Sequence, residues 1–337
     1  MRYVKVDKLR EGMISVRPLF SGRTLLLASN KKLTNTTISL LKENQFRGIY
    51  VYDEYRDYES FVELIDLDSR KSIVESLDEI DIDGLLYASS SLVDKLLQRP
   101  ELLIDLNELF YYDCSTYEHS INVAITSTAC GIRVGVPRDQ LQELATAAML
   151  HDIGKIAVPQ HILNKEGKLT DEERKIMERH AQYGYDILYN NYHITPRIRA
   201  AVRCHHENED GSGYPVKLKG KSIPLFARII HVADVYDALC KKRAYKDKFL
   251  HSESVEYILG GSGTMFDVDI VREFLKIIVV YPIGCDIELS DGSLARVVKN
   301  YVDFPLRPKV VVGGNVLDLA HDKSTYNLTV MHEVSDL

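Results

Sequence analysis

The chain has 337 residues, of which 45% are hydrophobic and 27% are charged, a composition that can bury sizeable cores in roughly two domains. Its net charge of -7 argues against a nucleic-acid polymer as partner, and its five scattered cysteines, with no C-x-x-C pair, argue against a disulfide framework. The N-terminus, MRYVKVDKLREGM, lacks an apolar signal region, and no run approaches the ~18 apolar residues of a spanning helix. We therefore expect a cytoplasmic protein without membrane insertion.

Residues 1–55 predict a small N-terminal α+β module. YVKV alternates, RTLLLAS is a short apolar run and GIYVYD is β-branched and aromatic, which are patterns of strands. Between them, NTTISLLKEN has helical spacing after a polar start. Residues 56–99 are helical and acidic in pattern and predict a connector.

Residues 100–278 predict an all-helical domain. SINVAITSTACGI and LQELATAAMLHDIG have a helical period, and we expect a glycine to close each helix. LTDEERKIMERHAQYGYDIL starts with Thr170 and Glu173 in capping-box spacing. TPRIRAAVRCHH predicts a helix with Thr195 as its N-cap and Pro196 at the first helical position, and IPLFARIIHVADVYDALCKK predicts a long apolar helix.

Residues 279–337 change to a period of two and predict a small C-terminal β domain. CDIELSDGSLARVV indicates a hairpin around Asp291-Gly292, and KVVV and YNLTVMH continue the pattern. The predicted fold class is therefore mainly α, with an all-helical core flanked by the small α+β module and the small β domain.

Polar residues interrupt the apolar helical faces at seven positions, which are His119, His151, Asp152, His180, His205, His206 and Asp234. Taken singly, each is more often a hydrogen-bonded or surface group than a ligand. Together they favour a metal site, because a bare polar group on a buried face costs several kcal/mol. Imidazoles and carboxylates without thiolate suit Fe or Mn, with Zn, Ni or Mg as further candidates. Seven ligands are too many for one ion and fit two divalent ions, with Asp152 as the bridge.

Several stretches resemble one known family. HDIGKIAVPQHIL, GKLTDEERKIMERHAQYGYDIL, HHENEDGSGYP and RIIHVADVYDAL with RAYKD are similar to the HD-GYP domain, a subgroup of the HD metal-dependent phosphohydrolases. The resemblance covers about residues 100–278 and implies an all-helical HD core, a two- or three-metal site and hydrolysis of a cyclic dinucleotide. The seven residues match its ligand positions. Three-metal members have a glutamate four residues before the first histidine, where this chain has Ser115, so we expect two ions.

The resemblance also implies roles around the metals. Asp152 would be catalytic as the bridging ligand, and Lys155 would contact the scissile phosphate, unless it is only a solvated lysine at a helix end. Arg243 and Lys246 match positions that contact the phosphates of the ligand. Tyr214 would help to position the substrate, although Gly-Tyr-Pro alone also predicts a turn.

The resemblance thus implies a metal-dependent phosphodiesterase of bacterial signal transduction. It would hydrolyse a cyclic dinucleotide, first cyclic di-GMP and otherwise cyclic GMP-AMP, through a hydroxide that two metals share. The alternative is a cyclic-dinucleotide-sensing or protein-interaction module with little turnover. A degenerate relative would normally have lost a ligand or the lysine, and this chain has kept them. A homodimer, signalling protein partners and the role of the terminal modules are left open.

Overall fold

The computed structural model describes residues 2–16, 18–21, 24–44, 46, 48–52, 65, 67–99, 102–104, 116–240 and 251–334. The chain divides into two compact units. One is formed by Leu64–Leu102 and Ser115–Ile277, and the other by Met1–Glu63, Leu103–Cys114 and Ile278–Leu337. The domain boundaries expected near residues 55, 99 and 278 stay a prediction.

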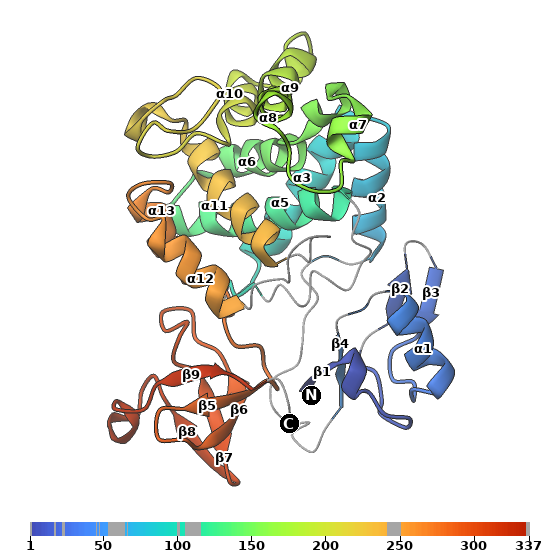
Figure 1. Cartoon of the computed structure of the whole chain (residues 1–337), viewed down its shortest axis with the longest axis vertical. Helices are drawn as coiled ribbons and strands as arrows, with labels where there is room; N and C mark the ends of the chain where they lie inside the picture. Colours follow the sequence, from blue (N-terminus) through green and yellow to red (C-terminus); the bar gives the residue numbers. More distant parts are fainter. Residues whose placement is uncertain are drawn as a thin grey trace. The chain divides into compact units, whose positions relative to one another are not determined.

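The first unit is helical (Figure 1). Its described elements are α2 (Leu67–Asp78), α3 (Ile82–Leu97), α5 (Thr116–Val134), α6 (Arg138–Leu150), η2 (Ile153–Ala157), α7 (Gln160–Leu163), α8 (Asp171–Glu178), α9 (His180–Leu188), α10 (Pro196–Cys204), η3 (Gly220–Ser222), α11 (Leu225–Cys240), α12 (His251–Gly260) and α13 (Val268–Leu275). This arrangement confirms the predicted helical core.

Helix α5 forms the centre of this unit. It packs on α6, α11 and α13, and also on α2 and α3 from the segment predicted as a connector. Ile121, Ala124, Ile125 and Ala129 are all fully buried. A helix that is apolar on most of its faces must be covered by neighbours on those faces, so α5 is the element around which the site is built.

The predicted helix starts are confirmed. The hydroxyl of Thr170 accepts from the backbone N–H of Glu173, whose side chain accepts in return from the backbone N–H of Thr170. The hydroxyl of Thr195 accepts from the backbone N–H of Ile198, and Pro196 occupies the first helical position. These contacts satisfy amide groups that a helix start leaves without partners.

Two expectations for the helix ends were wrong. Gly131 lies inside α5, and Gly154 lies in η2 after α6 has ended at Leu150. A Cβ on Gly131 would lie 2.5 Å from Leu144 Cδ2, so this glycine permits close packing of α5 on α6. The pattern LTDEERKIMERHAQYGYDIL also forms two helices, α8 and α9, because the chain turns at Arg179, where the imidazole of His180 binds a carbonyl of the last turn of α8.

The N-terminal module pairs β1 (Arg2–Lys5) with β4 (Gly48–Val51), and β2 (Leu19–Ser21) with β3 (Thr24–Leu27), both antiparallel. Helix α1 (Asn35–Glu43) and the short η1 (Val6–Lys8) complete it. Leu19, Leu33, Leu41 and Ile49 are almost fully buried in one apolar cluster. The strands and the helix thus share a small core of their own.

The C-terminal residues form a five-stranded antiparallel sheet in the order β8-β7-β6-β5-β9. Its elements are β5 (Asp286–Leu289), β6 (Leu294–Lys299), β7 (Lys309–Val312), β8 (Asn315–Asp318), η4 (Lys323–Thr325) and β9 (Val330–Glu333). The predicted hairpin joins β5 to β6, with Gly292 at φ +80°. Among the helices that the structure describes, none has both the length and the apolar character needed to cross a bilayer.

Candidate metal centre

Three histidines of the helical unit are oriented by the same hydrogen bond from Nδ1 to a backbone carbonyl. The Nδ1 atoms of His151, His180 and His205 lie 2.8, 2.7 and 2.7 Å from backbone carbonyls three residues earlier. His151 and His205 cap the ends of α6 and α10, and His180 begins α9. An Nδ1–H that donates to a carbonyl leaves the lone pair on Nε2, the atom that can bind a cation.

His119 on α5 is held by a carboxylate instead. Its Nδ1 lies 2.6 Å from Asp237 Oδ2, and Asn122 Nδ2 donates to the other oxygen of Asp237 at 3.0 Å. Its Nε2 lies 3.0 Å from Asp234 Oδ1. A histidine fixed by a carboxylate on one nitrogen, with the other nitrogen facing further ligands, is the arrangement common at protein metal sites.

The two aspartates and His206 complete the cluster. Asp152 Oδ2 lies 3.4 Å from His151 Nε2 and 3.9 Å from His119 Nε2, while its Oδ1 lies 3.5 Å from His180 Nε2. His206 Nε2 lies 3.2 Å from His180 Nε2. The carboxylate of Asp152 therefore faces histidines on both of its sides, as a bridging ligand must.

The structure thus brings all seven predicted residues together. Three groups have ligand atoms within 4.8 Å of one another, namely Asp152-His180-His205-His206, His119-His151-Asp152 and His151-His205-Asp234. Nε2 of His151 is buried, and the described residues provide it with no hydrogen-bond partner. A buried donor or acceptor without a partner is costly, and a cation would satisfy this nitrogen. Nitrogen and oxygen donors without a thiolate fit a divalent metal.

Burial determines the charge of most of these groups. It lowers the pKa of His180 and His205, and that of His206 to about 3, so these imidazoles are neutral and able to bind a cation. Burial opposes the charged form of His119 too, but hydrogen bonds to Asp234 and Asp237 raise its pKa to about 9. A cation bound by His119 would therefore displace a proton.

The carboxylates stay charged despite their burial. Burial by itself would raise the pKa of Asp234, but the hydrogen bond and charge of His119 bring it well below its usual range. For Asp152 the charge of Lys155 overcomes burial in the same way. The centre therefore presents two anionic ligands beside the neutral imidazoles of His180, His205 and His206.

Close backbone packing brings the segments of the cluster together. Gly154 follows the HD pair in η2, which packs on α9. A Cβ on Gly154 would lie 1.9 Å from the carbonyl oxygen of His180 and 2.4 Å from the backbone nitrogen of Gly184. Glycine at this position therefore lets Asp152 approach His180.

The segment after the histidine pair forms a wall of the site. The buried carboxylate of Glu207 accepts from the backbone N–H groups of Val216, Lys217 and Leu218 at 2.6–3.0 Å. Tyr214 stacks on His206, with ring centroids 4.8 Å apart. The residues that follow His205 and His206 thus form a loop that folds back over His206.

The remaining residues to which the sequence assigns a role lie outside the cluster of seven. Lys155 lies at the edge of the cluster, where its ammonium donates to Asp152 Oδ2, and it belongs to the 3₁₀ helix η2. Ser115, Arg243 and Lys246 lie outside the described residues. Their roles stay predictions.

From the sequence, Asn122 is not expected at the site, and Asp237, three residues after Asp234, is expected either to support a ligand or to pack the helix. The spacing of three residues that places Asn122 on the face of His119, and Asp237 on the face of Asp234, was the available signal. Which of the polar groups on those faces would meet depended on the packing of α5 on α11.

The family model described as the HD domain matches residues 92–270 of the chain. This chain is an HD-domain protein of the HD-GYP group. HD-domain phosphohydrolases are metal-dependent, and the His/Asp cluster lies within the matched residues.

Curated relatives of this HD-domain protein include named phosphodiesterases. A cyclic di-GMP phosphodiesterase of Pseudomonas aeruginosa is 35% identical over 251 residues, which cover 70% of this chain and 60% of the relative. A cyclic di-GMP phosphodiesterase of Thermotoga maritima is 37% identical over 55% of this chain and 50% of its own length. A 3′3′-cGAMP-specific phosphodiesterase of Vibrio cholerae is 32% identical over 59% of this chain and 44% of its own. The matches thus span about half of the relatives' length.

One solved structure resembles the HD-domain protein over most of the chain. An HDG"Y"P protein of Bdellovibrio bacteriovorus aligns with a TM-score of 0.52 at 15% identity, covering 81% of this chain and 97% of that one. At this identity the likeness concerns the fold.

Proposed function

We propose that this HD-domain protein is a metal-dependent phosphodiesterase that hydrolyses a cyclic dinucleotide, with cyclic di-GMP as the first candidate and cyclic GMP-AMP as the second. The observation that carries the proposal is the convergence of five histidines and two aspartates, with Nε2 atoms facing one another. The names of the relatives, two for cyclic di-GMP and one for cGAMP, support the class of substrate.

Two divalent cations, Fe or Mn before Zn, Ni or Mg, fit this donor set. His119, His151 and Asp234 would hold one, His180, His205 and His206 the other, and Asp152 both. Such cations supply an activated water and offset charge that develops on a phosphate. The overlapping groups of ligand atoms, with Asp152 in two of them, support two sites rather than one.

The chain's own residues would bind and orient the substrate. Lys155 is about one-third exposed beside Asp152, so its ammonium can reach a phosphate oxygen at the edge of the centre. Tyr214, stacked on His206, would provide one wall of the substrate site. Arg243 and Lys246 would add charge-assisted bonds to the phosphates, as their motif positions imply.

A combined metal and product analysis tests the proposal. We expect freshly purified protein to hold about two ions per chain. We also expect it to hydrolyse at least one of the two cyclic dinucleotides, cyclic di-GMP and cyclic GMP-AMP. Asp152→Ala should lose most of its metal and its turnover, because both cations lose a shared ligand. Asp171→Ala, which removes an exposed aspartate of α8, is the control and should change neither.

The other outcomes are equally informative. Full metal loading without turnover of either nucleotide would favour the sensing module. Unchanged metal content and rate in Asp152→Ala would contradict the assignment of the cluster, and three ions per chain would contradict the expected number.

A further inference from the structure

His206 differs from the other four histidines of the metal centre in how its ring is held. In each of those, a backbone carbonyl or the carboxylate of Asp237 lies within hydrogen-bond distance of Nδ1. Nδ1 of His206 lies 4.0 Å from Asp234 Oδ2, which is beyond a hydrogen bond. Its ring packs on the rings of His205 and Tyr214, whose centroids lie 4.0 and 4.8 Å away. The position of Tyr214 therefore bears directly on the orientation of His206.

Tyr214 belongs to a segment, residues 207–219, that contains no helix or strand. Backbone groups in such a segment need hydrogen-bond partners from elsewhere. The N–H of Tyr214 donates to the carbonyl of His206 at 3.2 Å. A Cβ on Gly213 would lie 2.3 Å from the backbone nitrogen of Asn208 and 2.4 Å from the carbonyl oxygen of His206. The backbone that leads into Tyr214 thus lies directly against the backbone of His206.

The backbone that follows Tyr214 is held by one side chain. Glu207 is only 1% exposed. Its Oε1 accepts from the N–H groups of Val216 and Lys217 at 2.6 and 3.0 Å, and its Oε2 accepts from that of Leu218 at 2.9 Å. Successive N–H groups next to a residue in the left-handed region, here Lys217 at φ +62°, form a concave site for an anion. The carboxylate of Glu207 occupies this site.

The first half of the segment is anchored independently of that carboxylate. Oδ1 of Asn208 lies 3.1 Å from Nε2 of His231, a buried histidine of α11. Nδ2 of Asn208 donates to the hydroxyl of Ser212 at 2.9 Å. Loss of the Glu207 carboxylate would therefore release the half that carries Tyr214 and leave the first half in place.

We propose that Glu207 is a positioning residue of the metal centre, which acts on His206 through Tyr214. The carboxylate holds residues 216–218, these hold the ring of Tyr214 on His206, and the stacked ring keeps the imidazole oriented before a cation binds. An imidazole without this support would have to be ordered when the cation binds, which lowers the affinity. This role rests on the metal centre of the proposed phosphodiesterase.

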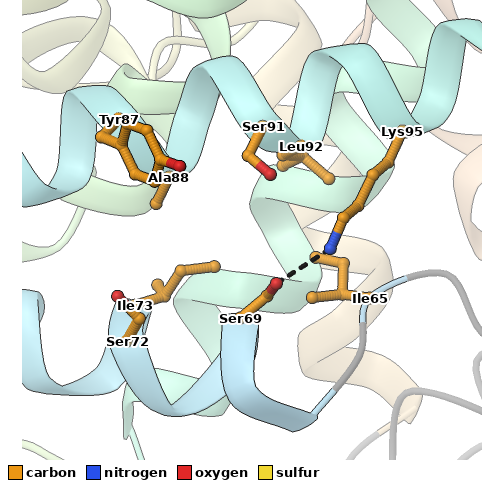
Figure 2. A pocket seen from close by; sticks show the side chains of 9 residues that line it. All are labelled: Ile65, Ser69, Ser72, Ile73, Tyr87, Ala88, Ser91, Leu92 and Lys95. Carbon is orange, nitrogen blue, oxygen red and sulfur yellow. Dashed lines mark hydrogen bonds between the residues drawn. The ribbon is translucent and has the colours of Figure 1, made fainter.

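Fluorescence quenching tests the first step without metal or substrate. The chain has no tryptophan, so Tyr214→Trp places a single reporter ring on His206. With EDTA present, we expect acrylamide to quench this ring at least about twofold more strongly once Glu207→Gln is added, because the amide NH₂ replaces an oxygen that accepts from a backbone N–H. Tyr87→Trp supplies the value for an exposed ring, since Tyr87 is 79% exposed and lines a pocket between α2 and α3 (Figure 2).

Glu172→Gln is the matched control, because it makes the same chemical change at an exposed glutamate of α8 and should not alter the quenching. Hydrogen exchange of the unaltered protein needs no variant. Val216 and Lys217 are exposed and lie outside helices and strands. We nevertheless expect their amide hydrogens to exchange at least about tenfold more slowly than unprotected ones, because Glu207 accepts them. Unprotected exchange there, or equal quenching with and without Glu207→Gln, would overturn the proposal.

Calorimetric titration with Mn²⁺ tests the second step. We expect Tyr214→Ala to bind Mn²⁺ about tenfold more weakly, and Glu207→Gln at least about threefold more weakly, than the unaltered protein. When Tyr214 is already alanine, Glu207→Gln should change the dissociation constant by less than about twofold, because the ring that transmits its effect is gone. Thermal unfolding of each variant shows whether it is folded.

Two results of this titration would overturn the proposal. The first is an unchanged Mn²⁺ affinity in Tyr214→Ala. The second is an equal loss from Glu207→Gln with and without the tyrosine, which would show that Glu207 only supports the fold around His206. Absence of Mn²⁺ binding in the unaltered protein would contradict the metal centre and this role with it. None of these measurements uses a cyclic dinucleotide, so a failure of the proposed activity is seen separately.

Discussion

Four histidines of the metal centre present Nε2 because Nδ1 is already occupied. In three of them a backbone carbonyl occupies Nδ1, and such an acceptor cannot be removed by substitution. In His119 the acceptor is Asp237, which Asn122 holds from the other side. Asp237 is thus a positioning residue that touches no predicted ligand atom of the cluster and acts through the orientation and basicity of His119.

Substitution of Asp237 should weaken metal binding without removing a ligand. We expect Asp237→Leu to lose about 10–100-fold in Mn²⁺ affinity, and Asp237→Asn to lose less, because an amide oxygen still accepts from Nδ1 without the charge. Calorimetric titration with Mn²⁺ measures both. Asp186→Asn, an exposed acid on α9, should have no effect. Equal affinities in Asp237→Leu and the unaltered protein would show that Asp237 only packs the helices.

Gly154 affects the same centre through space rather than charge. Gly154→Ala would place a methyl group against backbone atoms of His180 and Gly184, which cannot move aside as a side chain can. We expect a loss of about 1–3 kcal/mol or more in the free energy of unfolding, measured with urea, together with weaker Mn²⁺ binding. Gly260→Ala is the control, since a Cβ there meets nothing within 4 Å and should cost nothing or stabilise by up to about 1 kcal/mol. If Gly154→Ala lowers the free energy of unfolding no more than Gly260→Ala does, Gly154 does not approach the backbone of His180 and Gly184 this closely.

At the scale of elements, α2 belongs to the helical unit through a buried ion pair. The side chains of Arg70 and Glu118 are 3% and 10% exposed and lie 2.7 Å apart. Glu118 is next to His119, and as the helical spacing predicts, it points away from the metal centre. Two charges removed from water depend strongly on each other, because removal of one takes away the closest opposite charge from the other.

Removal of one partner should therefore cost more than removal of both. We expect Arg70→Ala to lose about 3–5 kcal/mol in the free energy of unfolding, and the double substitution Arg70→Met with Glu118→Leu to lose less. Urea denaturation measures each. Arg138→Ala breaks an exposed pair with Asp94, 62% and 47% exposed, and should cost no more than about 1 kcal/mol. If Arg70→Ala costs no more than Arg138→Ala, the ion pair does not hold α2.

At the scale of the whole molecule, the two units differ in their expected response to metal. All seven cluster residues lie in the helical unit, and the β strands lie in the other. A cation that binds only the folded helical unit stabilises that unit alone. The response to metal therefore reports on how independently the two units unfold.

Scanning calorimetry should show this difference. At about 100 times its dissociation constant, Mn²⁺ should stabilise the helical unit by about 2.7 kcal/mol, which raises its unfolding temperature by roughly 5–10 °C. A transition of the second unit should not move, and EDTA should reverse the shift. A single transition that moves as a whole would show that the two units unfold together, and no shift at all would argue against a cation at the cluster.

Local patterns in the amino-acid sequence were sufficient to predict the class of fold and the residue types of the centre. Helical and strand periods, the caps at Thr170 and Thr195, and the hairpin at Asp291-Gly292 depend on neighbours a few positions away, and these predictions are confirmed. The ligand candidates interrupted apolar faces, which is also a local signal. The ends of helices were less well predicted. Gly154 was expected to close a helix, but it lies in η2 and permits close packing against the backbone of His180.

Which of these groups meet, and through which atoms, depended on how the helices pack. His119 and Asp237 are 118 positions apart in the chain and lie within 2.6 Å, and Asp152 meets His180 because η2 packs on α9. The physical reason is that periodicity and capping are set within one helix turn, whereas contacts across helices depend on side-chain volumes that come together only when the chain is packed.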